Sequence, residues 1–206
     1  MPGEFEVHKG CILIWPSRPG SWRNEAREAK KAFAAVIEAI ARSEAVFLAA
    51  RKEDVAEATN FANELKRKQI PYPVTVFEAK TDDAWARDIG PTFVVSDKAN
   101  ERMVRAVNWE FNAWGGSYDG LYSHWENDQL IPNHLCKYLG DDLYEARPFV
   151  LEGGSIHVDG EGTLITTEEC LLSPGRNPTM TRDEIEEKLK QYLNVEKIIW
   201  LPYGIY

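Results

Sequence analysis

The amino-acid sequence predicts an α/β fold built from repeated ββαβ-like modules rather than from one doubly wound sheet. Short apolar runs rich in β-branched residues alternate with stretches of helical periodicity along the 206 residues. The loops between the strands are long and contain the unusual residues. Neither a GxGxxG nor a GxxxxGK motif occurs, so no motif supports a nucleotide cofactor.

Strands are predicted where apolar residues form short runs that end at turn residues. The runs at 11–15, 45–50, 74–77 and 197–201 predict strands outside hairpins. A polar turn at 96–102 joins 92–95 to 103–107 in a first hairpin, and 155–167 form a second.

Helices are predicted where apolar residues recur every three or four positions. The first covers residues 22–42, with Ser21 as a possible cap, and the second covers 52–68 before two prolines. A third covers 125–139. The last begins at Thr181, because Glu184 follows at the spacing of a capping box.

The composition is that of an ordinary globular protein, with 44% hydrophobic and 28% charged residues, and one domain is the default expectation. The formal charge of −9 argues against a nucleic-acid partner and would attract a small cation, although solubility alone explains it equally well. No run of 18 apolar residues occurs, so no membrane segment is expected.

Cys11, Cys136 and Cys170 are widely separated, so they form neither a CxxC metal pair nor a disulfide framework. This pattern fits a reducing compartment. The N-terminus has no basic region followed by an apolar stretch, and we therefore expect a cytoplasmic protein.

The segment 85–93 carries the strongest chemical signal, because it places Asp88 near Trp85 just before an apolar run. A carboxylate beside an indole suits a delocalised cation, since the acid pairs with the charge and the ring face attracts it. The alternative is a salt-bridged turn between a helix and a strand, because most loop acids are only solvated.

Several motifs, in register along nearly the whole chain, resemble the agmatine deiminase family of the guanidine-modifying superfamily. They include Trp-Ala-Arg-Asp-Ile-Gly-Pro, Phe-Asn-Ala-Trp-Gly-Gly and Leu-Glu-Gly-Gly-Ser-Ile-His-Val-Asp-Gly, followed by Thr-Thr-Glu-Glu-Cys-Leu-Leu, Arg-Asn-Pro and Leu-Pro-Tyr-Gly. In the order given, these motifs lie at 85–91, 111–116, 151–160, 166–172, 176–178 and 201–204. Nearer the N-terminus, Trp15-Pro16, Arg18 and Trp22 also match the family.

The resemblance implies a five-bladed α/β propeller of the pentein type, of which residues 1–206 would form one partial domain with about three modules. It also implies hydrolysis of agmatine to N-carbamoylputrescine and ammonia, a step of polyamine metabolism, without metal or organic cofactor. In that reaction a cysteine thiolate attacks the guanidinium carbon, and a histidine relays protons.

By motif, Asp88 corresponds to the guanidinium-binding aspartate and Trp85 to an aromatic wall of the pocket. Glu152 corresponds to the acid of the Glu-Gly-Gly motif, which orients the guanidinium or the catalytic histidine. Without the resemblance, Glu152 would be interpreted as a carboxylate at the end of a strand, bound to a tight turn. Asp119 either lines the pocket or forms a turn. Arg87 is expected to form a structural ion pair, because like charges repel at a cationic ligand.

The family's Gly-His-Val-Asp and Gly-Gly-Gly-x-x-His-Cys motifs do not occur in this sequence. His157 belongs to the Glu-Gly-Gly hairpin and does not replace the first motif. Cys170 follows Glu168 and Glu169, which would raise the pKa of its thiol, so all three cysteines are expected to be structural. The chain alone is therefore expected to lack deiminase activity.

Two alternatives remain open. One is a non-catalytic module that binds guanidines or polyamines, and the other is a deiminase acting on arginine or peptidyl-arginine. A partial propeller exposes strand edges, so a C-terminal half or a homo-oligomeric partner is also expected.

Overall fold

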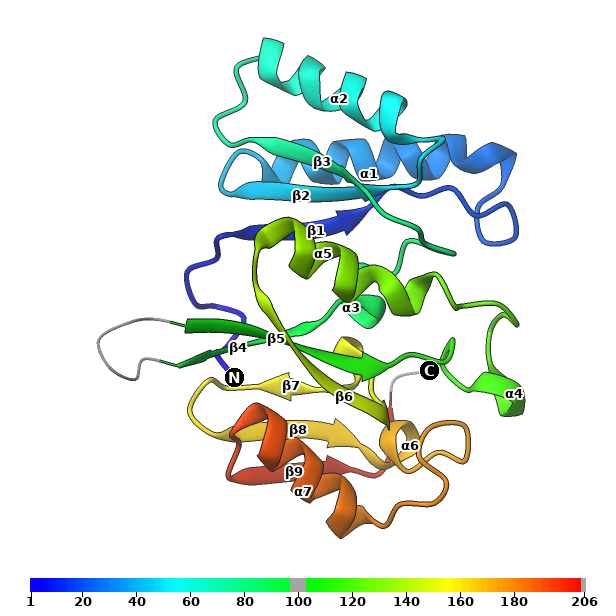
Figure 1. Cartoon of the computed structure of the whole chain (residues 1–206), viewed down its shortest axis with the longest axis vertical. Coiled ribbons are helices and arrows are strands. Elements are labelled where there is room, and N and C mark those ends of the chain that lie inside the picture. Colours follow the sequence, from blue (N-terminus) through cyan, green and yellow to red (C-terminus); the bar gives the residue numbers. More distant parts are fainter. Residues whose placement is uncertain (97–102, 205–206) are drawn as a thin grey trace. The chain divides into compact units, whose positions relative to one another are not determined.

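The computed structural model describes residues 1–96 and 103–204, which form two compact units (Figure 1). The first, here called the βαβ unit, contains Val7–Ala86 and Glu126–Ile131. The second, called the hairpin unit, contains Met1–Glu6, Arg87–Trp125 and the chain from Pro132 onward.

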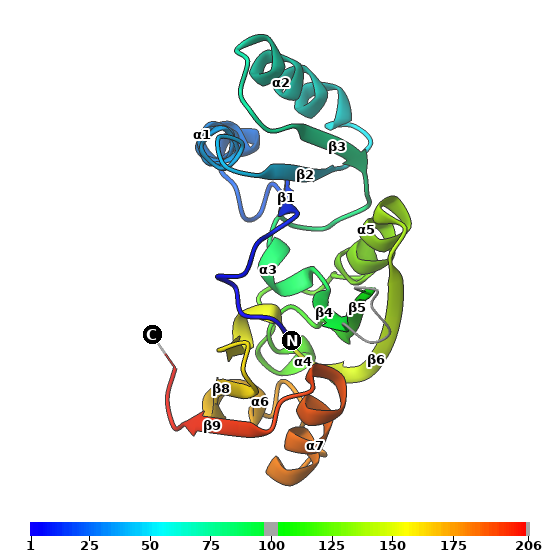
Figure 2. The same cartoon turned by 90° about the vertical axis from the view of Figure 1, so that its left-hand side faces the viewer.

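The βαβ unit contains a three-stranded parallel sheet in the order β1-β2-β3. Its strands and connecting helices are β1 (Gly10–Ile14), α1 (Arg27–Ile40), β2 (Ala45–Ala50), α2 (Val55–Arg67) and β3 (Val74–Glu78). Alternate residues of β2, including Val46 and Leu48, pack against Ile37 of α1 and Leu65 of α2. Because these β2 residues share one face, both helices cover the same side of the sheet, as can be followed in Figure 2.

The first helix begins later than the sequence predicts. Asn24, Glu25 and Ala26 have positive φ angles and form the short 3₁₀ turn η1 (Asn24–Ala26), so the α-helix starts only at Arg27. Ser21 does not cap this helix, since its hydroxyl donates a hydrogen bond to Asp83.

The second sheet, in the hairpin unit, has the order β4-β5-β6. Its antiparallel hairpin of β4 (Thr92–Ser96) and β5 (Met103–Glu110) confirms the predicted pairing, while the predicted turn at 97–102 lies outside the described residues. The chain returns through η3 (Asp128–Leu130) and α5 (Ile131–Leu139) to β6 (Asp142–Val150), which is parallel to β5. The helix predicted from residue 125 is therefore shorter, and β6 was not among the predicted strands.

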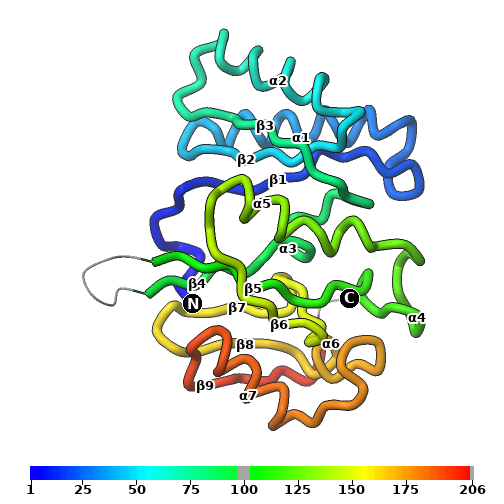
Figure 3. The backbone as a smooth tube through the Cα atoms, in the orientation of Figure 1, coloured from blue at the N-terminus to red at the C-terminus, as the bar shows by residue number. Residues whose placement is uncertain are grey.

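The third sheet has the order β7-β8-β9, and its chain path can be followed in Figure 3. Its elements are η4 (Gly153–Ser155), β7 (His157–Val158), β8 (Thr163–Thr167), α6 (Glu168–Leu171), α7 (Arg182–Leu193) and β9 (Lys197–Leu201). The hairpin β7-β8 is antiparallel, and β9 is parallel to β8. Leu189 and Leu193 of α7 are fully buried in a core with Leu164 of β8 and Val107 of β5.

The predicted mixed α/β class is confirmed. The second and third sheets each follow the ββαβ order of the predicted modules, whereas the first is a βαβαβ sheet. Among the described residues the three sheets are separate and none closes on itself. The five-bladed propeller and the single domain over residues 1–206 remain predictions.

Within the described part of the chain, no helix combines the length and the apolar character needed to cross a bilayer.

The predicted capping box at the start of α7 is confirmed. The Glu184 N–H donates to Thr181 Oγ1 at 3.3 Å, and the Thr181 N–H donates to Glu184 Oε2 at 2.7 Å. These two bonds satisfy backbone donors that the helix itself cannot pair.

We predict that Thr181→Ala lowers the free energy of unfolding by about 1 kcal/mol, because the side-chain acceptor of the cap is lost. Urea denaturation measures the change. The control is Thr179→Ala, at an exposed threonine two residues earlier. An equal loss in both variants would contradict a role of the cap.

Candidate functional site

Asp88 lies in the hairpin unit on α3 (Ala86–Ile89), a one-turn helix rather than the predicted loop. Its Oδ1 accepts a hydrogen bond from the Gly154 N–H at 3.2 Å, and the Trp114 side chain donates a second. The pKa of the Asp88 carboxyl is raised, first by its burial and then by the negative charge of Glu152. Asp88 and Glu152, 64 positions apart, are therefore electrostatic neighbours.

Glu152 lies between the end of β6 and η4, and only 1% of its surface is exposed. Its Oε2 accepts a hydrogen bond from the Ser155 hydroxyl at 2.6 Å, and its Oε1 lies 2.7 Å from Arg176 Nε. The Arg176 N–H is not aligned for a hydrogen bond with Oε1, so the two groups attract chiefly through their charges. Glu152 thus has a guanidinium partner from its own chain, which the sequence did not reveal.

Arg176 is held in place by hydrogen bonds of the next residue, Asn177, and of its own side chain. The Asn177 side chain exchanges two hydrogen bonds with the backbone of Val150, at 3.0 and 2.9 Å. Arg176 itself donates to the carbonyl of Trp114. The Arg-Asn-Pro motif therefore fixes this segment beside the end of β6, next to Glu152.

The two glycines of the Glu-Gly-Gly motif allow α3 to approach this turn. A Cβ at Gly153 would lie 2.3 Å from the Arg87 carbonyl oxygen, and a Cβ at Gly154 would lie 2.6 Å from Asp88 Oδ1. Side chains at these positions would push α3 away. Close contact with the turn therefore brings Asp88 near Glu152.

Cys170 borders the same site, with its Sγ 3.0 Å from Ser155 Oγ and 3.9 Å from Glu152 Oε2. The pKa of the Cys170 thiol is raised, as expected, but the causes are burial and the charge of Glu152 rather than Glu168 and Glu169. Burial also raises the pKa of Cys136, to about 11. Neither thiol has the lowered pKa of an activated nucleophile.

Asp119 is exposed at the end of α4 (Gly116–Asp119), within the aromatic loop. Its carboxylate lies against the backbone of Gly115 and Gly175, where added Cβ atoms would lie 1.8 and 2.4 Å from Oδ1. Asp119 therefore lies beside the residue that precedes Arg176, in the same unit as Asp88 and Glu152.

Trp85 belongs to the βαβ unit, unlike the three acids. Its ring stacks on Trp22 at 5.8 Å between centroids, and the Trp22 indole donates to Asp83 at 3.0 Å. The role of Trp85 as a pocket wall remains a prediction.

Two further residues singled out in the sequence take structural positions. Arg87 forms an ion pair with Glu4, as expected of a bracing residue. His157 is exposed on β7.

A cavity of about 1090 Å³ lies along α1 and α2 and includes Trp15, Lys30 and Phe61 in its lining. Its lining includes none of the four predicted site residues. Lys30 at its edge is already paired with Glu57 and Asp54. We therefore place the candidate site at the acids, where buried charges converge, and not at this cavity.

Comparison with known proteins identifies the family. The family model described as Porphyromonas-type peptidyl-arginine deiminase matches residues 1–206. The chain belongs to this family. "Putative agmatine deiminase 1" of Listeria monocytogenes is 53% identical over 206 residues, which are 100% of this chain and 54% of the relative.

Two solved structures of agmatine deiminases agree with this similarity. The agmatine deiminase of Enterococcus faecalis is 45% identical, with a TM-score of 0.89, over 99% of this chain and 53% of that one. A C. jejuni agmatine deiminase variant with substrate bound is 28% identical, with a TM-score of 0.81, over 100% of this chain and 56% of that one. The predicted resemblance is confirmed, and the chain spans about half the length of these relatives.

We predict that Gly153→Ala lowers the free energy of unfolding by about 1–3 kcal/mol, because the new methyl group meets a backbone carbonyl that cannot rotate away. Chemical denaturation measures the loss. The control is Gly20→Ala, whose added Cβ would have its nearest neighbour at 3.8 Å. An equally stable Gly153→Ala variant would show that the turn and α3 are not in close contact.

We predict that Asp88→Asn raises the melting temperature at pH 7 and leaves it nearly unchanged at pH 3. The folded pKa of Asp88 lies above its ordinary value, so the native protein loses stability as pH rises through that pKa and the carboxylate ionises in a buried position. The amide keeps an acceptor for the Gly154 N–H and carries no charge beside Glu152.

Thermal denaturation of both proteins across this pH range measures the difference. The control is Asp142→Asn, at a side chain that is 77% exposed, which should shift the melting temperature little at either pH. A lower melting temperature of Asp88→Asn than of the parent at pH 7 would contradict the predicted stabilisation.

Proposed function

We propose that this chain provides the substrate-orienting acids of an agmatine deiminase, with Asp88 as the direct partner of the substrate guanidinium. The supporting observation is the convergence of the Asp88 and Glu152 carboxylates beside the Gly153–Ser155 turn. Family membership and the names of the similar proteins support agmatine as the substrate.

The charges at the site support a cationic ligand. Glu152 is paired with the guanidinium of Arg176, whereas Arg87, the cation that acts on Asp88, already forms an ion pair with Glu4. The charge of Asp88 is therefore only partly compensated. The substrate guanidinium is planar, stays protonated and donates hydrogen bonds in a fork that matches a carboxylate. Its binding would compensate the charge that raises the pKa of Asp88.

Glu152 acts in this proposal as a positioning acid. Its ion pair with Arg176 and its bond to Ser155 fix the carboxylate, while the hydrogen-bond donors to Asp88 among the described residues are a backbone N–H and an indole. The two acids therefore have unequal roles in this proposal, with Asp88 in contact with the substrate and Glu152 orienting the groups around it. Asp119 and Trp85 remain proposed substrate contacts.

The reaction adds water to the guanidinium carbon of agmatine and releases ammonia, which leaves N-carbamoylputrescine. A thiolate must first form a bond to that carbon, and a general acid must protonate the departing ammonia. Cys170 is unsuited to the first role because of its raised pKa. We therefore propose that the nucleophile and the proton relay come from residues outside this sequence, in a C-terminal half or a partner chain, within a five-bladed propeller in the cytoplasm.

The second candidate is a deiminase for arginine or peptidyl-arginine, which the description of the matching family favours. Free arginine carries a carboxylate that agmatine lacks. An acid such as Asp119 near the site would repel that carboxylate and attract the distal ammonium of agmatine. A non-catalytic guanidine-binding module is the third candidate.

Calorimetry on the 206-residue chain tests these candidates with agmatine, arginine and putrescine. We expect agmatine to bind more tightly than arginine, without ammonia release. Asp88→Asn and Gly154→Ala should weaken agmatine binding by about tenfold to a hundredfold, because a charge-assisted hydrogen bond is worth about 1.5–3 kcal/mol. Asp142→Asn is the matched control and should bind as the parent does.

The outcomes separate the candidates. Absence of agmatine binding would overturn the proposed role of Asp88, and tighter binding of arginine would favour the second candidate. Ammonia release at an enzyme-like rate would overturn the inference that the nucleophile lies outside the chain.

A further inference from the structure

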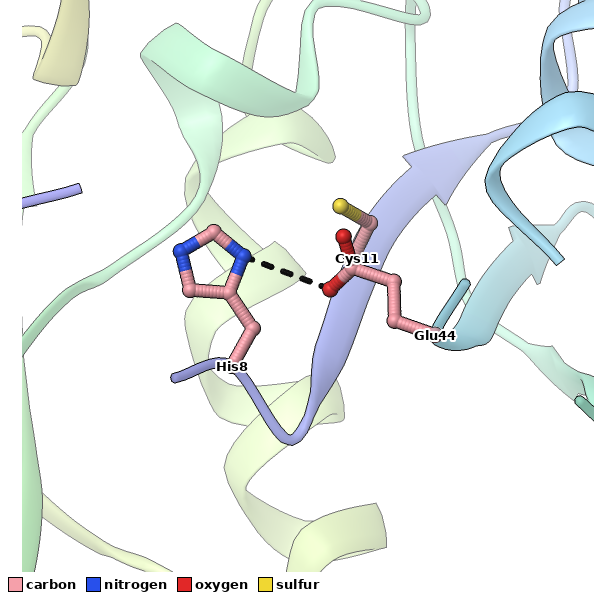
Figure 4. Close-up of side chains that lie close together, drawn as sticks. All are labelled: His8, Cys11 and Glu44. Atoms are coloured by element: carbon pink, nitrogen blue, oxygen red, sulfur yellow. Dashed lines mark ion pairs between the residues drawn. The ribbon is translucent and has the colours of Figure 1, made fainter. Parts of the chain in front are cut away.

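Three side chains with metal-binding chemistry meet at the beginning of the first sheet, within the βαβ unit (Figure 4). Gly10 and Ala45 are paired in the register of the parallel strands β1 and β2. His8 and Glu44, which shortly precede these residues, therefore lie at the same end of the sheet, and Cys11 is the second residue of β1.

The local backbone explains why these side chains are close. A Cβ at Gly10 would lie 2.4 Å from the Ala45 carbonyl oxygen, so glycine lets the start of β1 approach the start of β2. Two of the three residues, Cys11 and Glu44, lie in or directly beside paired strands. Ligands on such elements are positioned more rigidly than ligands on a free loop.

The distances fit a single ion. His8 Nδ1 lies 3.3 Å from Glu44 Oε2, and one ligand atom from each of the three residues lies within 4.8 Å of the others. Two ligands bound tetrahedrally to Zn²⁺ are about 3.3–3.8 Å apart, from metal–ligand distances of about 2.0–2.3 Å. Small side-chain rotations would bring the sulfur into this range.

The surroundings also suit an ion. Glu44 Oε2 is shielded from solvent and accepts no hydrogen bond from the described residues, and His8 is its ion-pair partner. The His8 side chain is 44% exposed, which leaves a route for an ion from solvent. Figure 4 shows the imidazole and the carboxylate facing each other, with the thiol beside them.

The geometry points to a site for a divalent transition-metal ion of the zinc class, bound by His8, Cys11 and Glu44. A thiolate, an imidazole and a carboxylate together favour such ions over Mg²⁺ or Ca²⁺, which prefer oxygen ligands alone. Three protein ligands leave a fourth position for water. On binding, the Cys11 thiol releases its proton to solvent and its sulfur forms the bond to the metal, so affinity increases with pH.

Cobalt(II) titration of the reduced 206-residue chain tests the site without any dependence on deiminase activity. We expect one equivalent of Co²⁺ to produce a thiolate-to-metal absorption band in the near ultraviolet together with the visible bands of tetrahedral Co²⁺. Zn²⁺ should displace it. Calorimetry with Zn²⁺ measures the affinity directly.

Variants assign the ligands. Cys11→Ala should abolish the thiolate band, whereas Cys136→Ala, at a buried cysteine of α5, should retain it. Glu44→Gln should weaken Zn²⁺ binding at least tenfold, whereas Glu38→Gln, on the exposed surface of α1, should not. If Cys11→Ala does not fold, the Glu44→Gln comparison decides.

Binding of Co²⁺ without a thiolate band would overturn the proposal, as would a band that persists in Cys11→Ala. Equal Zn²⁺ affinity of Glu44→Gln and the parent would do the same. In those cases His8 and Glu44 form an ion pair and no metal site.

Discussion

The ion pair between Glu152 and Arg176 is the interaction on which the candidate site depends. Both side chains are almost completely buried, and removing one partner of such a pair costs about 3–5 kcal/mol because a buried charge is left alone. Arg176 also connects this pair to a distant part of the sequence, because it donates a hydrogen bond to the Trp114 carbonyl. The next residue, Asn177, is bound to Val150. Asp88 lies beside this assembly, and its cationic neighbour Arg87 is already paired with Glu4.

Most of the fold follows from short-range patterns. The runs at 45–50 and 197–201 coincide with β2 and β9. β2 is apolar throughout because it is the central, mostly buried strand of its sheet. The strand β6 was missed because it lies at a sheet edge, where charged residues alternate with apolar ones and Pro148 is tolerated. The start of α1 was misplaced because residues 24–26 adopt positive φ angles, which L-residues rarely adopt and which the helical periodicity does not predict.

The site was only partly predictable for a similar reason. Asp88 and Glu152 were recognisable from their motifs, and the structure brings them together. No spacing rule connects Glu152 with Arg176, and no sequence pattern predicts that Ser155 and Cys170 contact each other at the same turn. Such a network forms only in the folded chain, because its members come from the residue before η4, from η4 itself, from α6 and from the loop that follows α6.

Because main-chain atoms of α3 meet the Gly153–Gly154 turn directly, the separation of the two carboxylates does not depend on the size of nearby side chains. Cys170 can therefore change volume without moving the backbone that carries the acids, whereas Ser155 has to keep the hydroxyl that holds Glu152. A redesign for other flat organic cations could vary Cys170 and keep the backbone frame, while residue 153 has to remain without a side chain.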